Sequence, residues 1–149
     1  MKTNVAMHAL LLNTQPSEAY VDEEYIDFIE WENCLLIKSF ALDLPKTFGD
    51  THYLDRTDCE ASINHIHVES LSMGLDLIYT WEKSLRKNQP ERRFIILLSC
   101  DLDGENVTAR FYQFRNDEPE WINSSDIEGY KNEALLIQTI IPNSKSDKN

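Results

Sequence analysis

The stretch FIILLSCDLDGENVTARFYQFR, from Phe94 to Arg115, holds the clearest strand signals in the chain. Phe94 to Cys100 is a continuous apolar run of strand length, which predicts a central strand. Apolar and polar residues then alternate from Asn106 to Arg115, as in a half-buried strand. Asp103-Gly104 lies between the two runs and supplies a tight turn. The stretch therefore predicts a β-hairpin.

A long helix is predicted immediately before this hairpin, from about Ser70 to Asn88. Basic residues near its end suit the negative end of a helix dipole, and Pro90 is a stop signal. Apolar residues recur at helical spacing along it, at Leu71, Leu75, Ile78, Trp81 and Leu85.

Other strands follow from alternating patterns on either side of this unit. Tyr25 to Trp31 and Cys34 to Leu42 flank a Glu32-Asn33 turn, which predicts a second hairpin. Val5 to Leu12 and Ala134 to Ile141 are predicted to be the first and last strands.

The remaining connections carry weaker signals. Ser62 to Val68 favours a short strand, although a helix stays open there, and Leu44 to Asp58 has the composition of a loop. Ser125 could cap a short helix through Glu128 to Lys131.

These elements predict an α+β fold: a twisted antiparallel β-sheet with one main helix, about 70–88, packed on one face. The length of 149 residues suits one domain, predicted to cover residues 1–142, followed by a disordered polar tail at 143–149. If the helix covers one face, the other face is either solvated or covers a partner.

The charge of the chain is unusual, because 26 acidic residues face 14 basic ones and give a net charge of −12. Nucleic acid and anionic membrane surfaces would repel such a chain, so neither is an expected partner. A basic protein is the complementary partner, while the plainer alternative is that the acidity only aids solubility.

The cysteines and the apolar runs indicate a cytoplasmic protein. Cys34, Cys59 and Cys100 are odd in number, far apart in sequence and without a CxxC motif, which indicates reduced thiols. The N-terminal apolar run is too short for a convincing signal peptide, and no run approaches the roughly 20 apolar residues of a membrane span.

We expect no catalytic site, cofactor site or metal site, although two motifs offer an alternative. His65-x-His67 has a metal-ligand spacing, with Cys59, Glu60 or Glu69 as further ligands, but surface histidines are the commoner explanation. Asp101 to Asn106 lacks the Gly and Glu positions of an EF-hand loop. No nucleophile motif or phosphate-binding glycine loop is present.

Two acidic segments that also contain aromatic residues are the predicted partner-binding regions. Interfaces favour aromatic anchors surrounded by polar groups, and acidic fields steer a basic partner. The competing interpretation is a solvated acidic face over core aromatics. The residues chosen are Asp22, Glu23, Glu24, Asp27, Glu30, Trp31 and Glu32 in the first segment, and Asp117, Glu118, Glu120, Trp121, Asp126, Glu128 and Tyr130 in the second.

Two stretches near the end of the sequence resemble a class of small bacterial immunity proteins. They are TARFYQFRNDEPEW, from Thr108 to Trp121, and IEGYKNEALLI, from Ile127 to Ile137. Those proteins accompany polymorphic or contact-dependent growth inhibition toxins. The resemblance implies a cytosolic protein that binds a cognate toxin domain, often a nuclease, and blocks it. It implies no catalytic residue and assigns no residue a role at the interface.

Three other functions remain open from the sequence. One is a general acidic interaction or regulatory domain unrelated to toxins, and another is a small metal-binding protein that uses His65 and His67. The third is a structural dimer that pairs sheet edges. The oligomeric state, the toxin and its mode of inhibition are not determined by the sequence.

Overall fold

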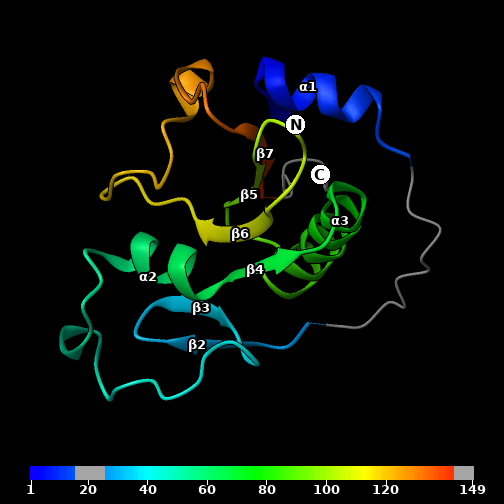
Figure 1. Cartoon of the computed structure of the whole chain (residues 1–149). Coiled ribbons are helices and arrows are strands. Elements are labelled where there is room, and N and C mark those ends of the chain that lie inside the picture. The colour runs from blue at the N-terminus through cyan, green and yellow to red at the C-terminus, as the bar shows by residue number, and fades with distance from the viewer. Residues whose placement is uncertain (16–25, 143–149) are drawn as a thin grey trace, which may run out of the picture.

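The computed structural model of the protein describes residues 1–15 and 26–142, and its elements form an α+β fold, as predicted (Figure 1). The main sheet is antiparallel with strand order β1-β7-β5-β6-β4, and β2 and β3 form a separate two-stranded sheet. The strands are β1 (Lys2–Thr3), β2 (Phe28–Trp31), β3 (Cys34–Ile37), β4 (His65–Val68), β5 (Phe94–Cys100), β6 (Val107–Gln113) and β7 (Ala134–Ile140). The helices are α1 (Val5–Leu12), α2 (Arg56–Ile63) and α3 (Leu71–Asn88), with 3-10 turns η1 (Phe48–Asp50) and η2 (Ser124–Gly129).

The predicted central hairpin is confirmed. β5 pairs with β6 from Phe94 opposite Gln113 to Ser99 opposite Thr108, and its other edge pairs with β7. Gly104 takes a φ of +85° in the connecting turn, a conformation that other residues adopt only with strain. The apolar run of β5 is therefore central, with neighbours on both edges.

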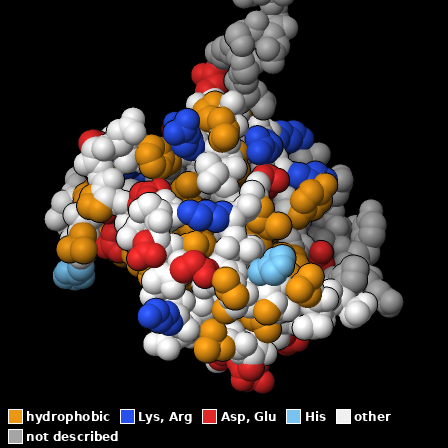
Figure 2. Space-filling view, turned by 90° about the horizontal axis from the view of Figure 1, so that it is seen from above, with side chains coloured by type: hydrophobic (Ala, Val, Ile, Leu, Met, Phe, Trp, Pro, Cys, Tyr) orange, Lys and Arg blue, Asp and Glu red, His pale blue; other side chains and the backbone are white. Residues whose placement is uncertain are grey.

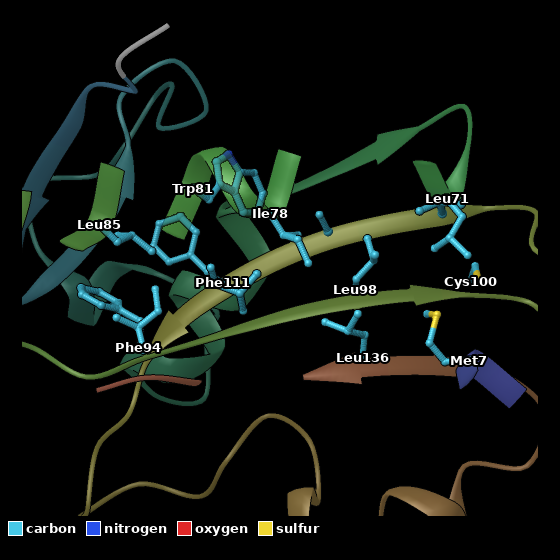
Figure 3. Packing of buried hydrophobic residues seen from close by; sticks show 14 of the residues in the cluster. Met7, Leu71, Ile78, Trp81, Leu85, Phe94, Leu98, Cys100, Phe111 and Leu136 are labelled. Carbon is cyan, nitrogen blue, oxygen red and sulfur yellow. The ribbon is translucent and has the colours of Figure 1, made fainter. Parts of the chain in front are cut away.

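The predicted long helix is also confirmed as α3, and it covers one face of the main sheet (Figure 1). Ser70 caps its first turn by accepting a hydrogen bond from Met73 N at 3.1 Å. Figure 3 shows side chains of α3 and of the sheet packed in one layer. The labelled residues include Leu71, Ile78, Trp81 and Leu85 from α3, and Phe94, Leu98, Phe111 and Leu136 from β5, β6 and β7.

The opposite face of the sheet is not left wholly open to solvent or a partner. Ala61 of α2 and Ile122 and Ile127 of the β6–β7 connection pack on Ile95 and Tyr112 there. The chain between β6 and β7 therefore acts as a partial cover, which narrows the surface left for a partner.

The prediction of a strand at Val5–Leu12 is wrong, because the segment is the helix α1. Asn4 caps this helix: its Oδ1 accepts a hydrogen bond from Met7 N at 3.0 Å and another from Leu135 N at 3.0 Å. The segment is rich in Ala, Leu and Met, which favour helix, and its apolar residues are too continuous to choose one period.

The boundaries of the weaker elements also need correction. Ser62 and Ile63 end α2, so only His65–Val68 forms the strand predicted for Ser62–Val68. α2 begins inside the predicted loop Leu44–Asp58, and β3 ends at Ile37, well before Leu42.

The short helix predicted after Ser125 is the 3-10 turn η2. No helix in the described part of the chain is long and apolar enough to cross a membrane. The tail predicted to be disordered, 143–149, lies outside the described residues.

Candidate functional site: an acidic surface at the start of α2

α2 joins the small sheet to the main sheet through its side chains. Asn64, which follows α2, accepts a hydrogen bond from Ile37 N at 2.9 Å and donates to Leu35 O at 2.9 Å. Glu60 accepts from Leu35 N at 2.7 Å and from Gln113 N at 2.8 Å. The two sheets share no ladder, so these two buried side chains supply hydrogen bonds that a neighbouring strand would otherwise make.

A buried ion pair completes this junction. Arg115 Nη1 lies 2.6 Å from Glu60 Oε1, and Arg115 Nη2 donates to Asn33 O at 2.9 Å. Burial lowers the pKa of the Arg115 guanidinium, but its hydrogen bond and charge interaction with Glu60 outweigh burial and hold the pKa above its usual value. Glu60 is therefore a structural group whose donors come from three residues, one in β3 and two at or just after the end of β6.

The first turn of α2 brings the two acidic segments of the sequence together. Arg56 Nε donates to Glu32 O at 2.6 Å, which ties β2–β3 to the helix. Thr57 donates to Glu118 Oε1 from both its N and its Oγ1, each at 2.8 Å. Glu32 and Glu118 are distant in sequence, yet they bind adjacent residues of one helix.

Acidic side chains of the helix itself extend this cluster. Asp55 caps α2 by accepting from Asp58 N at 2.7 Å, and Asp58 Oδ2 accepts from Leu54 N at 2.9 Å. Carboxylates at a helix N-terminus are stabilised by the helix dipole. We name this region, with Asp117 beside Glu118, the acidic surface; its residues are Glu32, Asp55, Asp58, Asp117 and Glu118.

An apolar side chain projects from the acidic surface. Leu54 is 91% exposed, immediately before the Asp55 cap, and is the most exposed large apolar side chain among the described residues. An exposed Leu can fill a pocket of a partner, and fixed acids around it can meet basic groups at the rim.

Two aromatic residues, Trp31 and Phe48, pack next to the acidic surface. Trp31 Nε1 donates to Pro45 O at 3.1 Å, and its ring lies 6.5 Å from that of Phe48. The Arg56 guanidinium lies 4.7 Å from the Phe48 ring centroid, and Phe48 N donates to Glu32 Oε1. The half-buried Trp31 therefore acts here as packing, not as a freely exposed anchor.

The contacts of Glu118 lower the pKa of its carboxyl. Burial raises the pKa of its carboxyl, but hydrogen bonds from Thr57 and the charge of Arg115 outweigh burial, so the pKa lies below its usual value. Glu118 is consequently held as a carboxylate, pointed at the helix start.

The other predicted partner-binding residues do not gather at this surface. Asp22, Glu23 and Glu24 lie outside the described residues. Asp27 is exposed at the start of the β2–β3 hairpin, and Glu30 forms an ion pair with Arg92 at 2.6 Å.

The later half of the second segment follows the β6–β7 cover towards α1. Glu120 accepts from Ser124 Oγ, Glu128 accepts from Val5 N, and Tyr130 Oη accepts from Asn123 N. Trp121 is half-exposed, with the Arg110 guanidinium 5.1 Å from its ring centroid, and Asp126 is exposed within η2. These contacts take the later acids of the segment towards α1 and η2, whereas Glu118 binds the first turn of α2.

The sequence prediction missed Leu54, Asp55 and Asp58, because Leu44–Asp58 was assigned to a loop. Asp55-Arg-Thr-Asp58 places a helix-capping residue three positions before another acid, a pattern typical of a helix start. That signal was available in the sequence, whereas the approach of Glu118 was not.

Two other groups were considered as sites. Oxygens of Asp101, Asp103 and Glu105 lie within 4.8 Å of one another in the β5–β6 turn, and carboxylates of this kind could hold a hard cation. A cavity of about 610 Å³ lies between the small sheet and α3, with Ile37, Phe40, Leu77 and Trp81 among its lining residues.

Two of the three cysteines lie in one cluster although they are 25 positions apart in the sequence. Cys34 and Cys59 are buried in one cluster. Interaction with the Cys59 thiol and burial raise the pKa of Cys34, whereas interaction with the Cys34 thiol lowers the pKa of Cys59. Burial raises the pKa of Cys100 to about 11.

The surface near α1 and η2 differs in charge from the acidic surface. Figure 2 shows this side of the molecule, where Lys and Arg side chains are interspersed with Asp and Glu and with hydrophobic groups. Mixed charge of this kind gives a basic partner less to recognise than a cluster of acids.

Comparison with known proteins gives one family match. Residues 2–146 match the model of a family described as Uncharacterized protein PM0498 family. No curated protein and no solved structure matches the chain.

Proposed function

The chain belongs to the PM0498 family, and we propose that it is a non-catalytic binding protein whose acidic surface docks a basic region of a partner protein. The observation that carries this proposal is Leu54, which is 91% exposed beside Asp55 and Asp58, two acids that hydrogen bonds hold in place.

Preorganisation of the acids supports binding. Hydrogen bonds from Thr57, Phe48 and the helix backbone hold Glu118, Glu32 and Asp55 in fixed positions. Groups that are already ordered lose little conformational entropy when a partner arrives. Fixed negative charge also accelerates the encounter with a basic surface.

The same contacts favour binding over catalysis at this surface. Asp55 and Glu118 accept hydrogen bonds from backbone N–H groups of α2, and Asp58 accepts one from Leu54 N, two residues before the helix. Carboxylates engaged in this way hold a helix start and have less freedom to exchange a proton with a substrate.

The resemblance to immunity proteins gives the partner a class. Asp117 and Glu118 lie inside the resembling stretch Thr108–Trp121. A toxin that cleaves nucleic acid has a basic substrate cleft, and an acidic inhibitor can occupy or flank that cleft. We therefore propose a cytoplasmic immunity protein that neutralises a cognate toxin domain, with a basic nuclease as the specific expectation.

The test is co-expression with the product of the gene immediately upstream, followed by co-purification and calorimetry. We expect that product to be toxic alone and to form a salt-sensitive complex with this chain. The variant Leu54→Ser with Asp117→Asn is expected to weaken the complex at least tenfold.

A matched control carries the same changes at the far end of the β5–β6 hairpin. Leu102→Ser with Asp103→Asn alters an exposed Leu and an exposed Asp at the turn, and should leave affinity unchanged. Undiminished binding by the Leu54 variant would refute the acidic surface as the interface. A harmless upstream product would refute the toxin assignment, and a different basic partner captured through Leu54 would favour a general interaction domain.

A further inference from the structure

His65 and His67 lie side by side on β4, the terminal strand of the main sheet. Residues two apart in a strand point to the same face, and the two ring centroids are 5.4 Å apart. His67 is exposed and His65 is half-buried, so the pair is open to solvent from one side.

The Nδ1 atom of each ring already has a partner from the protein. His65 Nδ1 lies 2.6 Å from Ser62 O, and a carbonyl only accepts, so this nitrogen carries the proton. His67 Nδ1 lies 2.9 Å from Thr108 Oγ1, and the hydroxyl can accept its proton in the same way. In the tautomer of His67 that donates from Nδ1 to Thr108, both Nε2 atoms offer a lone pair.

Contrary to the expectation from the sequence that no metal site is present, we propose that His65 and His67 form a binding site for a divalent transition metal of the Zn²⁺, Ni²⁺ and Cu²⁺ class, through their two Nε2 atoms. Metal-binding histidines usually donate their other ring N–H to a carbonyl or similar acceptor, which fixes the tautomer. Ser62 O and Thr108 Oγ1 occupy those positions here.

The ring separation agrees with a shared ion. Two imidazoles bound to one tetrahedral Zn²⁺ at about 2.0–2.1 Å from each nitrogen have centroids roughly 5 Å apart. The observed centroid separation of 5.4 Å, with the two ring planes 84° apart, is close to that value.

The other ligands suggested by the sequence are not part of this pair. Cys59 is buried in the cluster with Cys34, and Glu60 is bound by Arg115 and backbone donors. Among the described residues, the only grouping of three potential ligands is at the β5–β6 turn. The pair accordingly supplies two ligands and leaves the remaining positions to water or to a donor from another molecule.

A neighbouring cation does not block the site. Arg110 is the cross-strand partner of His65, but its guanidinium lies over Trp121 and donates to Ala61 O at 2.8 Å. The net charge of −12 also favours accumulation of cations around the protein.

The experiment is calorimetric titration of the metal-stripped full chain with Zn²⁺ and, separately, Ni²⁺ and Cu²⁺. We expect one ion per chain, with Cu²⁺ bound most tightly. His65→Ala and His67→Ala should each weaken binding at least tenfold, and the double variant should abolish it. The matched controls His8→Ala and His52→Ala change the two exposed histidines elsewhere and should bind like the wild type.

Nitrogen NMR of the imidazoles gives an independent readout. Zn²⁺ should shift the Nε2 resonances of His65 and His67 and leave their Nδ1 atoms protonated. Equal binding by the wild type and the double variant would overturn the proposal, as would loss of binding in Asp101→Asn with both histidines intact. The measurement needs no partner protein, so it can fail or succeed independently of the proposed docking function.

Discussion

The side-chain amide of Asn64 pairs with the backbone of Leu35 much as a neighbouring strand would. Its Nδ2 donates to Leu35 O at 2.9 Å, while its Oδ1 accepts from Ile37 N two residues further along β3. Asn64 is fully buried, so water cannot replace either bond. Asn64 is therefore one of the buried side chains, with Glu60, that hold the small sheet against the rest of the fold.

Asn64→Ala should be strongly destabilising. It leaves Leu35 O and Ile37 N without a partner in a buried place, at a cost of roughly 1–3 kcal/mol for each unsatisfied group. Urea unfolding of the variant and the wild type measures this loss. Asn13→Ala is the control, because Asn13 makes an exposed side-chain bond to Ala9 O at 3.3 Å. A similar loss in both variants would contradict the role assigned to Asn64.

The Glu60–Arg115 pair should show strong energetic coupling. Arg115→Met leaves the fully buried Glu60 carboxylate without its counter-charge, and breaking a buried pair in this way costs about 3–5 kcal/mol. Glu60→Gln in the Arg115→Met background removes the uncompensated charge and should cost much less than Glu60→Gln alone. A double-mutant cycle from urea unfolding gives the coupling, and additive effects would show that the pair contributes no specific interaction.

The sequence correctly predicted the elements whose apolar pattern fits either a strand or a helix but not both. The β5–β6 hairpin has a continuous apolar run, an Asp-Gly turn and an alternating strand, and α3 repeats its apolar face over five turns. α1 was missed because the run Val5–Leu12 is apolar on nearly every side, so alternation and helical spacing both fit it.

The candidate site was only partly predictable, for a different reason. α2 has eight residues and few apolar positions, so its main sequence signal is the Asp55 cap. The acidic segments were identified by composition, which marks a surface but does not show which acids meet. Glu118 reaches Thr57 because of the path between β6 and β7, and that path depends on tertiary packing.

Gly74 should tolerate no side chain, because α3 lies directly on the sheet there. A Cβ at this position would lie 2.8 Å from Leu98 Cδ1 and 3.0 Å from Val107 Cγ1, and both neighbours are fully buried. Gly74→Ala gains about 1 kcal/mol of helix propensity but incurs overpacking of typically 1–3 kcal/mol, so we expect net destabilisation.

Thermal unfolding measures the effect of Gly74→Ala. Gly49→Ala is the control, since its Cβ would have Thr47 Oγ1 at 3.8 Å as its nearest neighbour. A higher melting temperature for Gly74→Ala would show that α3 can move away from β5 and β6 at little cost.

Part of the protein's free energy of unfolding should be lost at acid pH because of Glu118. Hydrogen bonds from Thr57 and the charge of Arg115 hold the pKa of its carboxyl below the ordinary value despite burial, so the folded state favours the charged form. The stabilisation is complete above the unfolded-state pKa of about 4.3 and is lost as the pH falls through the lower folded-state pKa. Glu118→Gln should therefore be less stable than the wild type at neutral pH, and this difference in the free energy of unfolding should become smaller as the pH falls.

Urea unfolding across that pH range measures the difference, with Glu69→Gln as a control for the loss of one exposed charge. A difference that stays constant with pH would show that Thr57 and Arg115 do not stabilise the charged form of Glu118.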